Sequence, residues 1–322
     1  MEDGGQGGGE AGLEVAERKH RADLVFKGLT ALCALVVVLL MGAILAKLLQ
    51  SSRLAFSEFG PGFLTSQAWN PGTSQFGALS SVFGTAVSTA IAMLIAVPLS
   101  LVIAIFLVEV AHPTVARIVG GAVELLAAVP SIIYGMWGLF VFAALMQRTV
   151  QPALGRSLGF LPLFQGPPMG IGMLTAGIVL AIMVLPFITA VSRDVLLMVP
   201  PVLKESAHGV GATMWEATRK VSLRYGRNGI IGAVFLGFGR AVGETMAVTF
   251  VIGNSHRISA SLFEAGNTIA SSLANEFNEA SEPLYQSSLV SLAVVLFGIT
   301  LLFQIVAHLW LSRLGRQEGR PL

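Results

Sequence analysis

Charged residues and cysteines are both scarce in this chain of 322 residues. Asp, Glu, Lys and Arg together make up only 12% of it, about half the share found in an ordinary soluble domain. Cys33 is the one cysteine of the sequence, so it has no partner for an internal disulfide. Zinc sites built from paired cysteines are excluded for the same reason. The formal net charge of +2 is too small to indicate binding to nucleic acid.

Hydrophobic residues, by contrast, account for 54% of the chain, and the mean hydropathy is +0.76. A soluble core cannot hide that much apolar surface, whereas a lipid bilayer can, so the sequence predicts an integral membrane protein. A helix crosses the hydrocarbon core with about 20 apolar residues, and long runs without charge therefore mark the spans. Six spans are predicted: Gly28–Ala46, Phe76–Val108, Ile118–Gln147 with a bend at Pro130, Ser157–Ser192 with its helix starting near Met169, Asn228–Ser255, and Pro283–Ser312.

The connections between these spans differ in charge. Most of their Lys and Arg residues lie before the first span, between the fourth and fifth, and after the sixth. Because basic connections stay on the cytoplasmic side, both termini are expected on the cytoplasmic face of a bacterial cytoplasmic (inner) membrane. The external loops are then expected near 48–75, 148–168 and 254–285. The predicted organisation is a disordered cytoplasmic tail over 1–20, a first transmembrane helix over 21–49, an external loop over 50–75, a core of five helices over 76–313 that includes a cytoplasmic loop at 193–227, and a cytoplasmic tail over 314–322.

The cytoplasmic loop 193–227 is long, mixed in charge and patterned like a pair of short helices. Pro200 and Pro201 suit the start of the first helix, because proline fits the first helical turn. Gly211 breaks the pattern between the two helices. Met214 and Trp215 form an apolar knob of the kind that inserts into a groove on a partner. From spacing alone, a loop that simply lies on the membrane surface is an equal alternative.

The order of residues in this loop resembles the EAA loop of ABC-importer permeases. Glu205–Ala207 is followed after three residues by Gly211, and after nine more by Val221–Leu223. The family pattern is Glu-Ala-Ala, three residues, Gly, nine residues and Ile-x-Leu-Pro. The departures from it are Ser206, Val221 and Arg224.

In that family the loop is the coupling helix that seats in a cleft of a cytoplasmic ATPase. The resemblance therefore implies that the residues in contact with such an ATPase are Glu205, Ala207, Gly211, Met214 and Trp215. The nucleotide site itself is not expected in this chain, because a P-loop needs a Gly-Lys pair before Ser or Thr and the sequence contains no Gly-Lys pair.

Two charged residues, Arg240 and Glu244, lie inside the fifth predicted span. Arg240 follows Asn228 by a distance of about 18 Å along a helix, near the middle of the bilayer, where an arginine costs at least about 2.5–3.5 kcal/mol. One explanation is mutual neutralisation, since residues four apart on a helix are neighbours. The other is that Arg240 faces a water-filled path and offers its N–H donors to a passing oxyanion, with Glu244 as its resting counter-ion. Ionisable residues inside membranes mark pathways by default, which favours the second explanation.

The segment Gly239–Val248 resembles the Gly-Arg-Ala-x-Gly-Glu-Thr segment of the phosphate-specific ABC permeases. The Arg and Glu of that segment are tied to phosphate passage, so the resemblance implies this role for Arg240 and Glu244. Three further segments are similar to one of the two paralogous permeases of that family rather than to the other, PstA-like one: Phe63–Gly77, Val129–Gly138 and Leu262–Ala280.

Pro130 falls inside the third predicted span and bends it, which could shape a gate; simple tolerance of proline in a membrane helix is the slightly favoured alternative. Ser131 and Tyr134 follow the kink and could offer hydroxyls to an oxyanion at a gate, although a packing role is equally compatible with the sequence. No nucleophile with a neighbouring base and orienting group is recognisable, so the chain is expected to be a non-catalytic subunit. It is also expected to hold no metal or cofactor, with ATP and magnesium bound by the partner ATPase.

The resemblance implies an all-α integral membrane protein with six transmembrane helices and the type I ABC importer permease fold. It implies a permease subunit that forms half of the pathway of an ATP-driven phosphate importer. The expected partners are a PstA-like permease subunit, a PstB-like ATPase dimer, an external PstS-like phosphate-binding protein, phosphate and the lipid bilayer, and no nucleic acid. Two alternatives stay open: an ABC permease for another oxyanion such as molybdate or sulfate, and a secondary transporter driven by an ion gradient with Glu244 as proton carrier.

Overall fold

The computed structural model describes the backbone of residues 7–317 and the side chains of residues 23–313, in two compact units, 1–51 and 52–322. The first unit is a single long helix, α1 (Gly7–Ser51), whose apolar part contains the first predicted span. The helix begins within the stretch 1–20 that the sequence predicts as a disordered tail. Its first two turns pass into a run of Ala, Leu, Glu, Arg and Lys, which are good helix formers and allow the helix to extend beyond the span.

The second unit is built around two helices that pack along each other, α4 (Leu79–Ile105) and α9 (Met173–Leu197). Small residues at their contact allow this close approach, as they do in membrane helix pairs generally. A Cβ atom at Gly177 of α9 would lie only 2.6 Å from the Ile91 side chain of α4. A small residue also allows α12 (Leu223–Val242) to pack closely against α9, because a Cβ atom at Gly237 of α12 would lie 2.5 Å from the Ile188 side chain of α9. Their shared core consists largely of Ala, Val, Ile, Leu and Met side chains.

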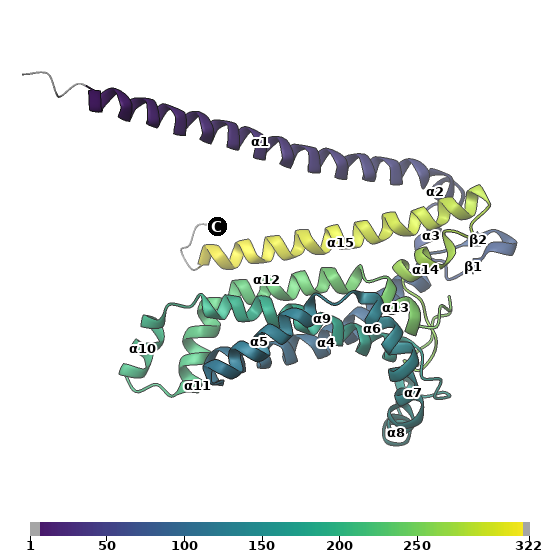
Figure 1. The fold of residues 1–322 in the computed structure, drawn as a ribbon. Helices are drawn as coiled ribbons and strands as arrows, with labels where there is room; N and C mark the ends of the chain where they lie inside the picture. Colours follow the sequence, from purple (N-terminus) through teal and green to yellow (C-terminus); the bar gives the residue numbers. More distant parts are fainter. Residues whose placement is uncertain (1–6, 318–322) are drawn as a thin grey trace, which may run out of the picture. The chain divides into compact units, whose positions relative to one another are not determined.

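Five helices in the described part of the chain are long and apolar enough to cross a membrane: 23–51, 79–110, 131–158, 173–197 and 283–313. The second of these combines α4 with a terminal π-helical turn, η2 (Phe106–Val110). The last is α15 (Pro283–Gln317), which runs beside α12 (Figure 1). The first, second, fourth and sixth predicted spans thus each correspond to one observed helix, and the third and fifth are built differently.

The third predicted span, Ile118–Gln147, is wrong in its boundaries. The chain forms an amphipathic helix, α5 (Pro113–Ala127), which is followed by three non-helical residues, 128–130. A new helix begins at Ser131. Proline lacks an N–H and disfavours helical geometry in the residue before it, so Pro130 separates two helices instead of bending one. The spanning helix after the break consists of α6 (Ser131–Trp137), η3 (Gly138–Phe142), α7 (Ala143–Leu145), η4 (Met146–Val150) and α8 (Gln151–Leu158). It extends through Arg148 and Arg156, which the sequence places in an external loop.

The fifth predicted span, Asn228–Ser255, is divided in the structure. Helix α12 starts earlier than expected and ends at Val242, and a separate short helix, α13 (Met246–Val251), follows after three residues. Gly239 and Gly243 weaken the helix at this point because glycine loses more backbone freedom than other residues on becoming helical. The six-span prediction therefore corresponds to five long helices and one broken segment.

The remaining elements lie at opposite ends of the second unit (Figure 1). At one end are the short helices α10 (Pro201–Gly209) and α11 (Met214–Ala217), followed by the π-helical turn η6 (Thr218–Ser222) that leads into α12. At the other end lies a cluster built on Phe63, Phe76, Ile269 and Leu289. Its elements are α2 (Arg53–Phe59), α3 (Gly62–Thr65), the antiparallel strands β1 (Trp69–Asn70) and β2 (Gln75–Phe76) joined by η1 (Pro71–Thr73), and α14 (Ile269–Glu276), while η5 (Pro162–Phe164) lies in the connection before α9.

Candidate functional site

Arg240 lies in the last turn of α12, half-buried against α9. Its guanidinium carbon is 5.6 Å from the centre of the Phe187 ring, within the range of a cation–π contact. The Nε atom is buried and, within the described residues, has no hydrogen-bond partner. Buried side-chain donors are nearly always satisfied, so an unpaired N–H on a cation is unusual.

The structure does not join Arg240 to Glu244. The predicted neighbour geometry required an unbroken helix, whereas α12 ends at Val242. The Glu244 carboxylate instead accepts a hydrogen bond from the Ala247 backbone N–H, at 3.1 Å between Oε1 and N. Neither residue belongs to any of the ion pairs formed by the described side chains. Glu244 thus satisfies one of the free N–H groups at the start of α13, a donor that a continuous helix would not have offered.

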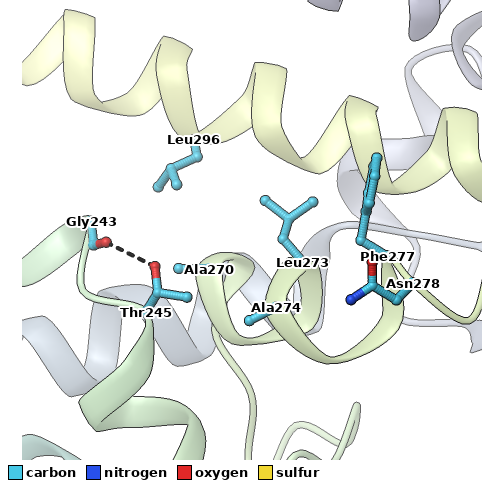
Figure 2. Close-up of a pocket in the computed structure, with 8 residues that line it drawn as sticks. All are labelled: Gly243, Thr245, Ala270, Leu273, Ala274, Phe277, Asn278 and Leu296. Carbon is cyan, nitrogen blue, oxygen red and sulfur yellow. Dashed lines mark hydrogen bonds between the residues drawn. The ribbon is translucent and has the colours of Figure 1, made fainter. Parts of the chain in front are cut away.

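A pocket of about 430 Å³ opens beside the break between α12 and α13 (Figure 2). Residues of the break, of α14 and of α15 line it: Gly243, Thr245, Ala270, Leu273, Ala274, Phe277, Asn278 and Leu296. The Thr245 hydroxyl donates to the Gly243 carbonyl at 3.3 Å, which leaves few free polar atoms in the pocket. Because its lining carries no charged side chain, the pocket is not by itself an anion site. In the described part of the chain no three His, Cys, Asp or Glu side chains are grouped so that they could hold a metal ion.

The predicted gate residues lie close to this break. Pro130 is exposed between α5 and α6, and Ser131 begins α6. The Tyr134 hydroxyl donates to the Leu126 carbonyl at 2.9 Å and so joins the two helices across the interruption. The Tyr134 side chain packs against the buried cluster that contains Ala241, the residue next to Arg240. Tyr134 therefore lies in the neighbourhood of the candidate arginine, but its proton is already engaged by the backbone and is not free for an oxyanion.

Helix α6 contacts α13 directly, which brings the predicted gate segment against the segment that follows Glu244. A Cβ atom added at Gly135 would lie 2.9 Å from the Ala247 Cα atom and 2.8 Å from the Phe250 ring. Such a close contact is possible only because this position is glycine. The structure thus gathers Arg240, Glu244 and Tyr134 around one region where two of the predicted spans are interrupted.

The loop 193–227 has the predicted pair of short helices. Helix α10 begins at Pro201, and Gly211 forms the turn with a φ of +88°, a conformation that favours glycine. Helix α11 starts with a capping box in which Thr213 and Glu216 satisfy each other's backbone N–H groups. The predicted contact residues are accessible: Glu205 and Gly211 are exposed, Ala207 is half-buried, and Met214 and Trp215 are 54% and 63% exposed.

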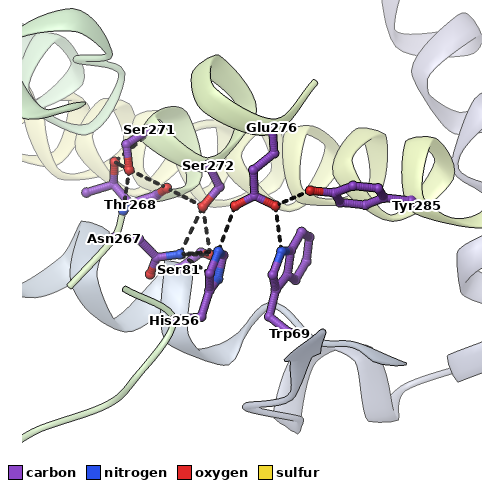
Figure 3. Close-up of polar contacts among 9 residues, drawn as sticks. All are labelled: Trp69, Ser81, His256, Asn267, Thr268, Ser271, Ser272, Glu276 and Tyr285. Atoms are coloured by element: carbon purple, nitrogen blue, oxygen red, sulfur yellow. Dashed lines mark hydrogen bonds and ion pairs between the residues drawn. The ribbon is translucent and has the colours of Figure 1, made fainter. Parts of the chain in front are cut away.

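A polar cluster at the opposite end of the unit was not predicted from the sequence. Its centre is the Glu276 carboxylate, which accepts hydrogen bonds from Trp69 Nε1 and the Tyr285 hydroxyl at 2.6 Å each (Figure 3). His256 Nε2 lies 2.7 Å from the other carboxylate oxygen, and the His256 ring stacks on Trp69 with 5.0 Å between ring centres. Trp69 and Glu276 belong to two of the segments that carry the resemblance, but nothing local in the sequence indicates that they meet.

The cluster continues to α4 through Asn267 (Figure 3). The Asn267 amide nitrogen lies 2.7 Å from His256 Nδ1, and it donates to the hydroxyls of Ser81 and Ser272 at 3.0 and 2.9 Å. The Asn267 backbone passes so near α4 that its carbonyl oxygen occupies the space where a side chain at Gly84 would begin. The loop between α13 and α14 is therefore fixed to the start of α4.

The hydrogen bonds to Glu276 determine how this cluster depends on pH. Burial alone would raise the pKa of the carboxyl, but the hydrogen bonds from His256, Tyr285 and Trp69 outweigh it and hold the pKa below its usual value. A carboxyl with a lowered folded pKa stabilises the fold above its unfolded pKa of about 4.3, and this contribution is lost as the pH falls through the folded pKa.

We therefore expect Glu276→Gln to reduce stability at pH 7 by about 1.5–3 kcal/mol, the range for hydrogen bonds to a charged group. The deficit relative to the unmodified chain should shrink as the pH falls below about 4.3. Thermal unfolding of the purified complex at both pH values measures it. Glu279→Gln is the matched control, because Glu279 is exposed and makes no side-chain hydrogen bond or ion pair to the described residues. An equal loss in both variants, or an undiminished deficit at low pH, would contradict the prediction.

Comparison with known proteins identifies the family of this chain. Residues 79–316 match the family of binding-protein-dependent transport system inner membrane components. The chain is 52% identical over 301 residues to the phosphate transport system permease protein PstC of Mesorhizobium japonicum, covering 92% of both chains. It is 49% identical over 305 residues to the protein of the same description from Pasteurella multocida, covering 94% of this chain and 95% of that one.

Among solved structures, the chain is similar to one from a bacterial alginate ABC transporter in complex with an alginate pentasaccharide-bound periplasmic protein. The TM-score is 0.59 with 15% sequence identity, over 93% of this chain and 98% of that one. At this identity the likeness concerns the fold alone, and it confirms the predicted importer-permease fold. The fold and the extent of the sequence matches agree, and the chain belongs to the family of binding-protein-dependent transport system inner membrane components, as a relative of the PstC permeases.

Proposed function

We propose that this chain is the permease subunit of an ATP-driven importer of inorganic phosphate and forms half of its transmembrane pathway. The relatives described as PstC support the substrate, since two of them are about half identical to this chain over nine-tenths of its length. The observation that carries the proposal is the Arg240 guanidinium, a cation among apolar helices with a buried N–H that no described residue satisfies. A phosphate oxyanion supplies the acceptor and the negative charge that this group lacks.

Glu244 has a different part in this proposal from the resting counter-ion that its sequence position suggests. Its carboxylate binds the start of α13 and therefore stabilises the interruption between α12 and α13. That arrangement leaves the Arg240 charge uncompensated by any carboxylate of the described residues. We infer that Glu244 positions the broken segment and Arg240 contacts the anion. Tyr134 joins α5 to α6 across the neighbouring interruption, through the hydrogen bond from its hydroxyl to the Leu126 carbonyl.

The partners follow from the two ends of the second unit. The exposed side chains of Glu205, Met214 and Trp215 suit the cleft of a PstB-like ATPase, which would act as a dimer and bind ATP and magnesium. A PstA-like permease would supply the other half of the pathway. A PstS-like phosphate-binding protein would dock at the end that carries the Glu276 cluster. In this orientation α10 and both termini lie in the cytoplasm of a bacterial cell, in agreement with the basic charge of the connections.

Uptake of radiolabelled phosphate by proteoliposomes tests the proposal. The vesicles contain this chain with its companion permease and ATPase, and receive the binding protein and phosphate outside and ATP inside. We expect uptake that requires ATP, survives an uncoupler of ion gradients and is reduced by unlabelled phosphate but not by sulfate or molybdate. Collapse of uptake by the uncoupler would favour a secondary transporter, and competition by sulfate or molybdate would favour another oxyanion as substrate.

A further inference from the structure

An ion pair connects the cytoplasmic helix α10 to the end of α4. Lys204 Nζ of α10 lies 2.8 Å from Glu109 Oε1 in the turn η2. The side chains are only 23% and 11% exposed, so the pair is largely withdrawn from solvent. It differs in this respect from the pair Lys220–Glu216 on the same loop, which joins residues one helical turn apart, measures 3.4 Å and is 73% and 44% exposed.

Helix α10 otherwise packs on α11 and η6, which belong to the same loop. None of its residues is buried. Its remaining side-chain hydrogen bonds are local, from Ser206 to the Val202 carbonyl and between His208 and the Ala212 carbonyl. Within residues 23–313, no second side-chain hydrogen bond or ion pair ties α10 to a spanning helix. A displacement of α10 must therefore either break the Lys204–Glu109 pair or move the end of α4.

Helix α4 is suited to carry such a displacement along the unit. It packs along α9 through close contacts, including the hydrogen bond from the Ser100 hydroxyl to the Leu185 carbonyl at 2.9 Å. At its far end, the Thr85 hydroxyl accepts the Ile269 backbone N–H at 3.0 Å, and Asn267 donates to Ser81. One helix thus connects the coupling loop to the cluster around Glu276 at the opposite end of the unit.

We propose that Lys204 and Glu109 are positioning residues that transmit the movement of α10 to α4 and so couple ATP hydrolysis to the opening of the pathway. The inference rests on the proposed function, because it requires an ATPase that moves α10. A partly buried pair suits this role because the loss of one partner leaves the other charge withdrawn from water and uncompensated. The exposed Lys220–Glu216 pair gains little and is screened by solvent.

The test measures the number of ATP molecules hydrolysed per phosphate imported in proteoliposomes that contain the full complex. We expect Glu109→Gln and Lys204→Met each to raise this ratio about fivefold or more, the lower end of the range for coupling between sites, while hydrolysis continues. The exchange variant Glu109→Lys with Lys204→Glu restores the pair in reverse and should return the ratio to within about twofold of the unmodified complex.

Lys220→Met is the matched control and should leave the ratio unchanged, because it removes the same charge from the exposed pair of the same loop. Unchanged ratios in the single variants would overturn the proposal, as would an exchange variant no better than the single ones. Loss of the ATPase from the purified complex would assign the pair to assembly and overturn it as well. Failure of the unmodified complex to import phosphate would instead refute the proposed function, so the two failures are distinguishable.

Discussion

Replacement of Arg240 by glutamine is expected to reduce phosphate uptake sharply and to leave the complex assembled. Glutamine retains a polar amide on a shorter side chain, but it removes the positive charge and the fork of N–H donors that suits a phosphate oxygen pair. Hydrogen bonds to a charged group contribute about 1.5–3 kcal/mol, so uptake should fall by about 10- to 150-fold. Assembly should survive because none of the described residues depends on Arg240 for a hydrogen bond or ion pair.

Two further variants separate the charge from the shape of the side chain. Arg227→Gln makes the same substitution on the same helix at an exposed position, and it should leave uptake near the unmodified level. Arg240→Lys keeps the charge without the planar fork and should retain part of the activity. Uptake of the Arg240→Gln complex within twofold of the unmodified one, at equal protein content, would show that the guanidinium does not contact the anion.

The environment of Arg240 illustrates what the sequence contains and what it leaves open. A charged residue within a long apolar run is visible without any structure, and its high cost in a bilayer identifies it as a candidate. Its relation to Glu244 is not visible in this way, because the spacing of four residues is informative only if the helix continues. The break at Gly243–Thr245 removes that premise. The pairing depends on the local backbone, and the short helix that follows the break packs against α6, a contact that the spacing of Arg240 and Glu244 does not reveal.

The structure of the loop 193–227 was predicted more completely than that of the third span. Pro201 and Gly211 act through their own backbone preferences, so their effects on α10 and on the turn can be read locally. The same local rule misled at Pro130, where a long apolar run on both sides favoured one bent helix. The structure instead has a separate helix α5 against α9, which hydropathy cannot distinguish from a continuing span.

Two of the polar contacts that connect distant segments had no signal in the sequence. Lys204 and Glu109 are 95 residues apart, and Trp69 and Glu276 are 207 residues apart. Neither pair follows a helical or strand period, so only the packing of the spanning helices brings the partners together. The resemblance to known permeases covers the segments around Trp69 and Glu276, yet it identifies them as similar sequences and not as a contact.

The second large effect is expected from Gly211→Pro, which should uncouple ATP hydrolysis from transport. Gly211 has a φ of +88°, and its N–H donates to the His208 carbonyl at 2.9 Å. Proline fixes φ near −65° and has no N–H, so it removes both features of the turn between α10 and α11. The helices must then change their relative direction, so that under the proposed function the exposed Met214 and Trp215 no longer meet the ATPase cleft together with Glu205. The amount of ATPase that co-purifies with the complex should fall about tenfold, equivalent to about 1.4 kcal/mol of binding free energy.

A pair of alanine variants makes this prediction specific to the backbone. No atom of the described chain lies within 4 Å of a Cβ added at either Gly209 or Gly211, so steric contact is the same for both. Gly209 has an ordinary helical φ, and alanine there should be neutral or slightly favourable to α10. Alanine at Gly211 must adopt the left-handed conformation at about 1–2 kcal/mol, which predicts an intermediate loss of ATPase binding. If Gly209→Ala and Gly211→Ala behaved alike, or if Gly211→Pro kept its ATPase and its ratio of ATP to phosphate, the turn would not determine how the loop seats.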